Sequence, residues 1–434
     1  MRDSRIWRLV LGVQDTVIER VVFDEDAGAV IVSVRPVARA QNRCGLCRAR
    51  CARYDGGIGR RRWRSTDWGE VAVYLEAPAP RVSCREHAVV VAAVPWARHD
   101  AGHTRSFDDT VTWMATQMSQ SAIRELMRIA WRTVGVIVAR VWADTGLRRD
   151  RLAGLRRIGI DEVAYKKGHK YLTVVVDHDS GRLVWAAEGR DKATLHTFFD
   201  ELGRERTSKL THISADGASW IAAVLVKRCP KAVRCADPFH VVAWANQALD
   251  TVRRAAWNRL RNRAASVEPP SAAGKFKSRS APSTTPAATV KKTRWALVKK
   301  PQDLTDNQKA ALAWIEVNDR QLHRAYLLKE ALRLVFALPH EQAVAALDAW
   351  ISWARRCRIP AFVALQKTIV KHRPQILASI EHNMSNGRVE SVNTKIRLIT
   401  RRGFGFHSPD AVIALAMLSL GGARPQLPGR KTHG

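Results

Sequence analysis

The sequence predicts a multidomain protein with α+β and α/β parts, in which a mixed domain is interrupted by a helical insertion and preceded by two small modules. Three observations favour this architecture. Cysteine pairs cluster near the N-terminus, strand and helix patterns alternate over residues 158–236, and long helical patterns separate that region from a last helix near residue 390. With 434 residues, 46% of them hydrophobic, the chain can build two or more packed domains.

The segment 1–92 is expected to form a small zinc-binding module. Its four candidate ligands are Cys44, Cys47, Cys84 and His87. The C-x-x-C and C-x-x-H spacings are typical of two tight turns that hold one tetrahedral Zn²⁺. A strand-like stretch over 70–75 lies between the two turns. Cys51 is a rival fourth ligand, and an iron–sulfur cluster or free thiols are the alternatives to zinc.

The segment 93–150 is expected to form a helix-turn-helix. Apolar residues repeat at helical spacing over 107–118, 123–130 and 134–141. The short break at 131–133 would place Thr133 as the cap of a recognition helix. Arg132 and Arg140 favour DNA binding, and with Thr133 they are the candidate DNA contacts. An ordinary three-helix packing unit is the alternative.

The segment 151–245 shows the strand order of an RNase H-like sheet. Strands are expected at 158–160, 170–177, 182–188, 210–215 and 232–236, and helices at 193–202 and 218–227. Three antiparallel strands followed by two alternating strand–helix units give that order. We therefore expect an RNase H-like catalytic domain, with a second part at 379–425 and a tail at 426–434.

Three acidic residues, Asp161, Asp216 and Glu390, are candidate catalytic ligands. The two aspartates follow predicted strands, and Glu390 lies on a helix whose apolar residues repeat at helical spacing. Strand ends and a flanking helix can bring three carboxylates together, as two Mg²⁺ (or Mn²⁺) ions about 3.5–4 Å apart require for in-line phosphoryl transfer. Ordinary solvated acids at element ends are the alternative.

Other acidic residues compete with this trio. Glu162 follows Asp161, but successive strand side chains point to opposite faces, and we favour Asp161. Asp177 and Asp179 flank a predicted hairpin turn, where acids commonly form turn hydrogen bonds, so we expect them to be structural.

Asp237 and His240 form a D-x-x-H pair just after a predicted strand. They are candidates for a supporting role in the active site. The structural alternative, in which His240 bonds backbone and Asp237 caps the following helix, is equally favoured.

The segment 246–378 is expected to hold a basic linker and the helical insertion. Residues 264–293 are rich in Ala, Pro, Ser, Thr and Lys, which predicts a mobile linker. Helical patterns run over 307–338, 341–357 and 362–370. Trp314, Trp350 and Trp353 are expected in the core of the insertion, although an aromatic side chain at a DNA junction could stack on an unpaired base.

Composition indicates a polynucleotide partner. Lys and Arg total 72 against 40 Asp and Glu, which gives a formal charge of +32 and a pI of about 10.8. The electrostatic field of so large a positive charge attracts polyphosphates.

We find no apolar stretch of about eighteen residues and no signal-peptide core, so we expect an intracellular protein without a membrane partner. An odd count of seven cysteines argues against a disulfide framework, and Cys229, Cys235 and Cys357 are expected to be buried.

Four segments carry a resemblance to a known family. They are GIDEVAYKKGHKYLTVVVDHDSGRLVW, SADGASW, CADPFHVV and SNGRVESVNTKIRLITRRGFG. They closely resemble the DDE transposases of the bacterial insertion-sequence family called ISL-three, over residues 44–420. The resemblance implies that the metal-binding trio falls on Asp161, Asp216 and Glu390. It also implies an N-terminal zinc module, in which family members usually have cysteine where this chain has His87.

The expected function is that of a transposase that binds terminal inverted repeats, nicks the element ends and transfers the freed strand to target DNA. Lys395 and Arg397, on the helix that carries Glu390, are further candidate DNA contacts. We expect a homo-oligomer on DNA, in the cytoplasm at the bacterial nucleoid. A DNA-binding regulator without cleavage activity and an RNase H-like nuclease are the alternatives.

Overall fold

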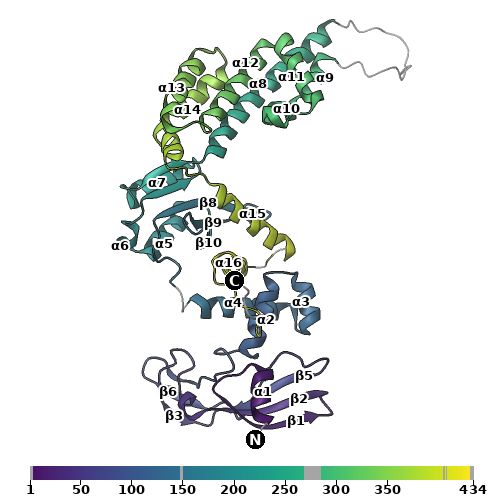
Figure 1. Ribbon diagram of the computed structural model, residues 1–434, viewed down its shortest axis with the longest axis vertical. Helices are drawn as coiled ribbons and strands as arrows, with labels where there is room; N and C mark the ends of the chain where they lie inside the picture. The colour runs from purple at the N-terminus through teal and green to yellow at the C-terminus, as the bar shows by residue number, and fades with distance from the viewer. Residues whose placement is uncertain (1–2, 147–149, 268–284, 404–405, 407, 431–434) are drawn as a thin grey trace, which may run out of the picture. The chain divides into compact units, whose positions relative to one another are not determined.

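The computed structural model describes residues 3–146, 150–267, 285–403, 406 and 408–430. The chain forms two compact units (Figure 1). One comprises residues 1–154, 162–190 and 391–434, and the other residues 155–161 and 191–390. No helix of the described residues combines the length and apolar character needed to cross a membrane.

The N-terminal part of the first unit is built from two small sheets. It begins with α1 (Asp3–Leu11), followed by β1 (Thr16–Asp24), β2 (Ala29–Pro36), a 3-10 turn (Ala38–Ala40), β3 (Ala52–Asp55), β4 (Arg60–Arg64), β5 (Ala72–Pro78), β6 (Arg81–Cys84) and β7 (Ala88–Val91). One sheet has the order β1-β2-β5-β4 and the other β3-β6-β7. Alternate residues such as Val32, Val34 and Leu75 are fully buried, and they form a core with Trp63 and Trp96.

Three helices follow in the first unit, α2 (Arg105–Ala115), α3 (Gln120–Met127) and α4 (Trp131–Gly146), which confirms the three helical patterns. The predicted cap at Thr133 is wrong, because α4 begins at Trp131 and Thr133 lies within its first turn. Arg128 explains the difference. It adopts the left-handed conformation (φ 51°) that ends α3, so the turn between the helices comes earlier than predicted.

The central sheet has five strands in the order β10-β9-β8-β11-β12. The strands are β8 (Arg157–Lys166), β9 (Lys170–Asp177), β10 (Leu183–Glu188), β11 (His212–Ala215) and β12 (Val233–Ala236), and the accompanying helices are α5 (Lys192–Leu202), α6 (Arg204–Thr207) and α7 (Ser219–Arg228). β9 pairs with β10 antiparallel, whereas β11 pairs in parallel with both β8 and β12. Each predicted strand and helix of this region is therefore present. β8 is longer than predicted and passes through Asp161.

The hairpin turn between β9 and β10 confirms the structural role of Asp177. Its buried carboxylate accepts hydrogen bonds from Asp179 N (3.1 Å) and Ser180 N (3.2 Å). These contacts close the turn as an Asx-type motif.

The insertion is a helical bundle within the second unit (Figure 1). Its helices are α8 (Pro238–Val267), α9 (Pro286–Lys292), α10 (Arg294–Val298), α11 (Asp306–Asn318), α12 (Arg320–Val335), α13 (His340–Arg356) and α14 (Pro360–Glu381), with a 3-10 turn at Pro301–Asp303. Both α12 and α14 pack against α8, and α14 also packs against β12. The bundle thus returns the chain to the sheet from which α8 departs.

Several expectations for the insertion are wrong in detail. The pattern over 307–338 is two helices, because Asp319 leaves the helical conformation. The side chain of Asp319 caps the start of α12 by accepting a hydrogen bond from Leu322 N (3.0 Å). The third helix extends beyond residue 370 to Glu381. The predicted linker over 264–293 is helical at both ends, within α8 and α9, and its central residues 268–284 lie outside the described residues.

The tryptophans of the insertion divide into buried and exposed. Trp350 is buried and donates Nε1 to Leu328 O (2.7 Å), which confirms its core position. Trp314 is partly buried against the same core. Trp353 is 37% exposed, so its predicted core position is wrong. Cys229, Cys235 and Cys357 are buried as expected.

Two C-terminal helices complete the chain, α15 (Gly387–Arg402) and α16 (Pro409–Leu420). The apolar residues that predicted α15 are all buried, at Val389, Val392, Ile396 and Ile399. α16 packs against α4 and β10 within the first unit. The helix that carries Glu390 is therefore present where the sequence predicts it.

Candidate active site and metal-binding cluster

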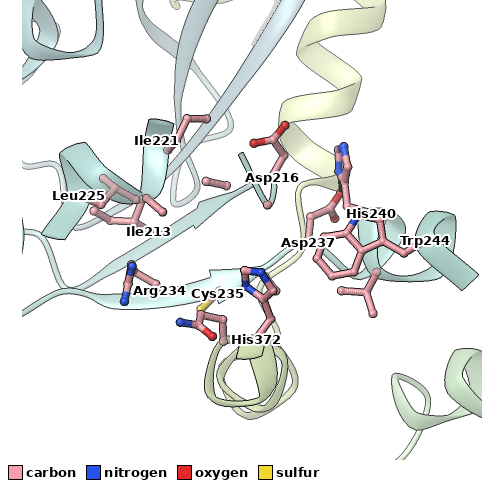
Figure 2. Close-up of a pocket in the computed structure, with 16 residues that line it drawn as sticks. Ile213, Asp216, Ile221, Leu225, Arg234, Cys235, Asp237, His240, Trp244 and His372 are labelled. Atoms are coloured by element: carbon pink, nitrogen blue, oxygen red, sulfur yellow. Dashed lines mark hydrogen bonds and ion pairs between the residues drawn. The ribbon is translucent and has the colours of Figure 1, made fainter. Parts of the chain in front are cut away.

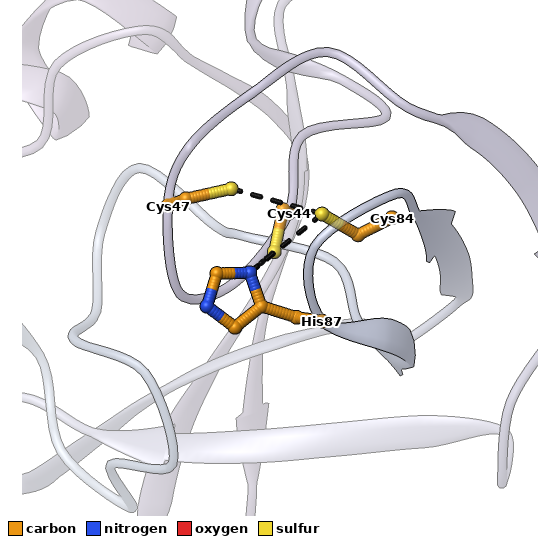
Figure 3. A group of neighbouring side chains, drawn as sticks. All are labelled: Cys44, Cys47, Cys84 and His87. Atoms are coloured by element: carbon orange, nitrogen blue, oxygen red, sulfur yellow. Dashed lines mark hydrogen bonds between the residues drawn. The ribbon is translucent and has the colours of Figure 1, made fainter.

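Cys44, Cys47, Cys84 and His87 form a compact cluster in the first unit (Figure 3). Their ligand atoms all lie within 4.8 Å of one another. His87 Nδ1 is 3.8 Å from Cys44 Sγ and 3.7 Å from Cys84 Sγ, and Cys47 Sγ is 3.7 Å from Cys84 Sγ. Four ligands at the Zn–S bond length would sit roughly 3.8 Å apart at the corners of a tetrahedron. The donor set and its spacing therefore fit a tetrahedral metal.

Local backbone structure forms the first of the two turns. Cys44 N donates to Ala49 O (2.8 Å), and Arg48 N donates to Cys44 O (3.1 Å). Gly45 is required within this turn, because a Cβ there would lie 2.6 Å from Val91 O.

Two further observations concern which side chains bind the metal. The hydrogen bond from His87 lowers the pKa of the Cys84 thiol to about 6, which favours the thiolate form that binds metals. Cys51 lies outside the four-residue cluster, and its Sγ donates to Ala49 O (3.4 Å). Geometry thus favours His87 over Cys51 as the fourth ligand.

In the second unit, three neighbouring parallel strands carry an aspartate at equivalent positions. Ala215 of β11 is paired with Ile160 of β8 on one side and Ala236 of β12 on the other. The next residues along the three strands are Asp161, Asp216 and Asp237. Parallel pairing in register therefore sets three carboxylate-bearing residues in a row at one edge of the sheet.

Asp237 is buried and holds three groups. Its Oδ2 lies 2.9 Å from His240 Nδ1, and its Oδ1 accepts Phe239 N and Asn386 N, both at 3.3 Å. The expected helix-capping contact of Asp237 is thus present at Phe239. The expected bond from His240 to backbone is replaced by the bond to Asp237, because Asp237 is only 4% exposed and its carboxylate needs a charged or polar partner.

The pKa of His240 is affected by the acidic residues at the same edge. Its hydrogen bond with Asp237 raises its pKa, and the charges of Asp237, Asp216 and Asp161 act in the same direction. Asp161 and Asp216 are therefore close enough to His240 to favour its protonated form.

Asn386 connects the start of α15 to the sheet. Its side-chain Oδ1 accepts a hydrogen bond from the hydroxyl of Ser214 in β11, and its backbone N donates one to the Asp237 carboxylate. Its backbone carbonyl accepts a hydrogen bond from Glu390 N (2.8 Å). Asn386 is only 2% exposed, and Ser214 is fully buried. One residue thus links the helix of Glu390 to the strands that precede Asp216 and Asp237. Among the described residues, the four N-terminal ligands form a group that could hold a metal ion, and the trio is not found as such a group.

The competing acid Glu162 has a different environment. Its side chain is 8% exposed and forms an ion pair with Arg190. This partner neutralises Glu162 outside the row of Asp161, Asp216 and Asp237, as the alternation of strand side chains predicts.

Sequence reasoning did not predict that Ser214 and Trp244 contact residues of the candidate active site. Ser214 precedes Asp216 by two residues and therefore shares its strand face, which is a signal that could have been used. Trp244 follows His240 by four residues and shares its helix face in the same way. Their contacts to Asn386 and Gly217 are long-range and have no local signature.

Comparison with known proteins identifies the family of the chain. Residues 158–416, more than half of the chain, match a family model described as transposase, the DDE type of ISL3. The chain belongs to the ISL3 family of DDE transposases. Residues 92–142 match the helix-turn-helix domain of transposase family ISL3, and residues 40–87 match the zinc-finger of transposases IS204, IS1001, IS1096 and IS1165. The ISL-three resemblance is thereby confirmed.

Two curated relatives extend the match over nearly the whole length of this ISL3 transposase. The transposase for insertion sequence element IS1557 of Mycobacterium tuberculosis (strain ATCC 25618 / H37Rv) is 58% identical over 100% of this chain and 99% of its own length. The transposase for IS1001 of Bordetella parapertussis is 25% identical over 94% of this chain and 96% of its own length.

The metal cluster leads to a test of ligand identity. Purified full-length protein should contain about one Zn²⁺ per chain, and His87→Ala should lose most of it, because three ligands hold the ion less tightly than four. Metal content by mass spectrometry of the purified protein measures this. Cys51→Ser is the matched control and should keep the metal. Loss of zinc in Cys51→Ser together with retention in His87→Ala would contradict the assignment.

Proposed function

We propose that Asp161, Asp216 and Glu390 are the catalytic carboxylates of this transposase and hold two Mg²⁺ or Mn²⁺ ions. The observation that carries the proposal is the strand register, which places Asp161 beside Asp216 at one sheet edge. Carboxylate oxygens suit these hard cations. When bound, the ions would activate the attacking oxygen and stabilise the leaving oxygen at a DNA phosphate.

The chain's own residues would orient this site. Asp237 holds His240 on one side and the backbone of Asn386 on the other, so the D-x-x-H pair supports the trio. The raised pKa of His240 favours an imidazolium that can offset part of the negative charge of Asp161, Asp216 and Asp237 and of an approaching phosphate. We assign Asp237 and His240 supporting roles on this basis.

We further propose that the catalytic domain is RNase H-like. The strand order β10-β9-β8-β11-β12, with an antiparallel hairpin followed by parallel strands, supports that fold. The proposed boundaries keep the catalytic domain at 151–245 and 379–425, separated by the linker and insertion at 246–378. Residues 1–92 and 93–150 would form the zinc module and the DNA-reading module, with a tail at 426–434.

Recognition of terminal inverted repeats is assigned to the N-terminal modules. Arg132 is exposed at the start of α4 and is well placed to contact DNA, whereas Arg140 is half-buried and paired with the fully buried Asp108 (3.3 Å). We therefore propose Arg132 as a DNA contact and revise Arg140 to a structural role. Thr133 is half-buried within the first turn of α4, so it is a weaker candidate for a DNA contact than Arg132. Zn²⁺ in the Cys₃His cluster would stabilise the preceding module.

Backbone contacts are assigned to dispersed basic residues. Lys395 is exposed on α15 and Arg397 is half-exposed, so both can approach phosphates near Glu390. The formal charge of +32 supports binding to DNA at the nucleoid, with a strong dependence on salt. We propose a homo-oligomer on the two element ends, as strand transfer between paired ends requires.

The trio is tested by charge-removing substitutions. Asp161→Asn, Asp216→Asn and Glu390→Gln should each lower cleavage of a duplex carrying the element end by about 10³-fold, because each removes a ligand worth several kcal/mol of transition-state stabilisation. Cleavage rates by gel assay and end binding by mobility shift are measured together. Binding should remain, and Glu162→Gln, the matched control, should cleave within a few-fold of wild type. A trio variant that cleaves at the wild-type rate removes that residue from the site.

The Asn386 link is tested separately. Ser214→Ala and Asn386→Ala should each lower the cleavage rate by about 10- to 100-fold, as loss of a residue that orients a metal ligand does. The Mn²⁺ concentration for half-maximal protein binding, measured by calorimetry, should rise in parallel. Ser208→Ala alters an exposed serine and serves as control. Unchanged Mn²⁺ binding and cleavage in both variants would show that Glu390 is held by other contacts.

A further inference from the structure

A pocket opens directly beside Asp216 (Figure 2). It lies among β11, β12, α7, α8 and α14, and has a cavity volume of about 70 Å³. Its walls are mainly apolar, with Ile213, Ile221, Leu225 and Val241 among the lining side chains. An apolar pocket next to a catalytic carboxylate has room for part of the substrate.

Trp244 forms an aromatic wall of this pocket and touches the backbone next to Asp216. A Cβ at position 217 would lie 2.7 Å from Trp244 Cζ2, so the residue after Asp216 must be glycine for the indole to occupy this place. Figure 2 shows Trp244 beside Asp237 and His240, on the same side of the pocket as Asp216. The indole is therefore held within contact distance of the chain that presents the carboxylate.

His372 of α14 adds a second ring. Its centroid lies 5.5 Å from that of Trp244, with the two planes tilted by 44°. Burial is the main cause that lowers the pKa of His372, so the ring is neutral near pH 7 and offers an aromatic face rather than a charge.

The pocket also offers a hydrogen-bond acceptor that the protein does not use. Gln375 lines the pocket, and its buried Oε1 has no hydrogen-bond partner among the described residues. A buried acceptor of this kind is costly unless a ligand supplies a donor. Aromatic rings, apolar walls and a few polar groups match a nucleobase, which has two π faces and a hydrogen-bonding edge.

We propose that this pocket takes one unstacked nucleobase of the strand that is cut, with Trp244 as its stacking surface. Gln375 Oε1 then accepts a hydrogen bond from the exocyclic amino group of adenine, cytosine or guanine. Removing one base from the stack lets the adjacent phosphate approach carboxylates that lie at the edge of a sheet. The inference rests on the proposed role of Asp216, and it adds a binding site for the base itself.

The first test measures base unstacking by the wild-type, full-length protein. Duplexes carrying the element end contain 2-aminopurine at one position at a time around the cleavage site, and Ca²⁺ replaces Mg²⁺ to slow cleavage. Fluorescence should rise upon binding at one position, because 2-aminopurine brightens when it leaves the stack. A signal that stays flat at every position would overturn the proposal.

The second test assigns the unstacked base to Trp244. Trp244→Ala should lower cleavage by about 10- to 100-fold, the loss expected for one base–aromatic stack, and Trp244→Phe should keep most of the activity. A duplex that lacks the base at the position found above should restore Trp244→Ala to within a few-fold of wild type. Trp353→Ala, which alters the exposed tryptophan of α13, is the control and should cleave normally.

These outcomes separate the pocket from the catalytic assignment. If the trio variants lose cleavage but Trp244→Ala cleaves at the wild-type rate, the pocket proposal fails and the proposed function stands. A Trp244→Ala protein that no abasic duplex rescues also contradicts the proposal, since its defect is then unrelated to the base. If the trio variants cleave normally, the proposed function fails first.

Discussion

Parallel pairing of β11 with β8 and β12 is the constraint on which the candidate active site depends. The pairing aligns Ile160, Ala215 and Ala236, and so places an aspartate from each strand at one edge of the sheet. A shift of one residue in either pair would turn an aspartate to the opposite face. Fully buried apolar residues such as Ile158 and Ile160 oppose such a shift, because it would remove them from the core that they fill.

Glu390, the third proposed ligand, is linked to this edge by another route, since the helical insertion separates it from the sheet in sequence. α8 leaves the sheet directly after Asp237, and α14 returns along β12 to the loop before α15. Asn386 then joins that loop to Ser214 and Asp237. The insertion therefore matters to the proposed chemistry in two ways: it returns the chain to the loop whose Asn386 contacts the sheet, four residues before Glu390, and its helices supply Trp244 and His372 to the pocket beside Asp216.

Local patterns in the sequence predicted the strands, most helices and the Cys₃His cluster, because these depend on short-range periodicity and spacing. The positions of helix ends were less predictable: Arg128 and Asp319 end or start helices through backbone conformations that no periodicity reveals. The exposure of Trp353 and the contact of Asn386 with Ser214 depend on tertiary packing across long separations in the chain. The trio was predicted from strand ends and family resemblance, whereas the contacts of Asn386 with Ser214 and Asp237, to which we assign its orientation, required the structure.

The most direct measurement of the central claim is the position of Mn²⁺ in crystals of the full-length protein, located by anomalous diffraction. The account predicts Mn²⁺ bound by carboxylate oxygens of Asp161, Asp216 and Glu390, with Asp237 still bonded to His240 and Asn386. Mn²⁺ bound instead by Glu162 or by Asp237, with Glu390 turned away from the sheet edge, would contradict it.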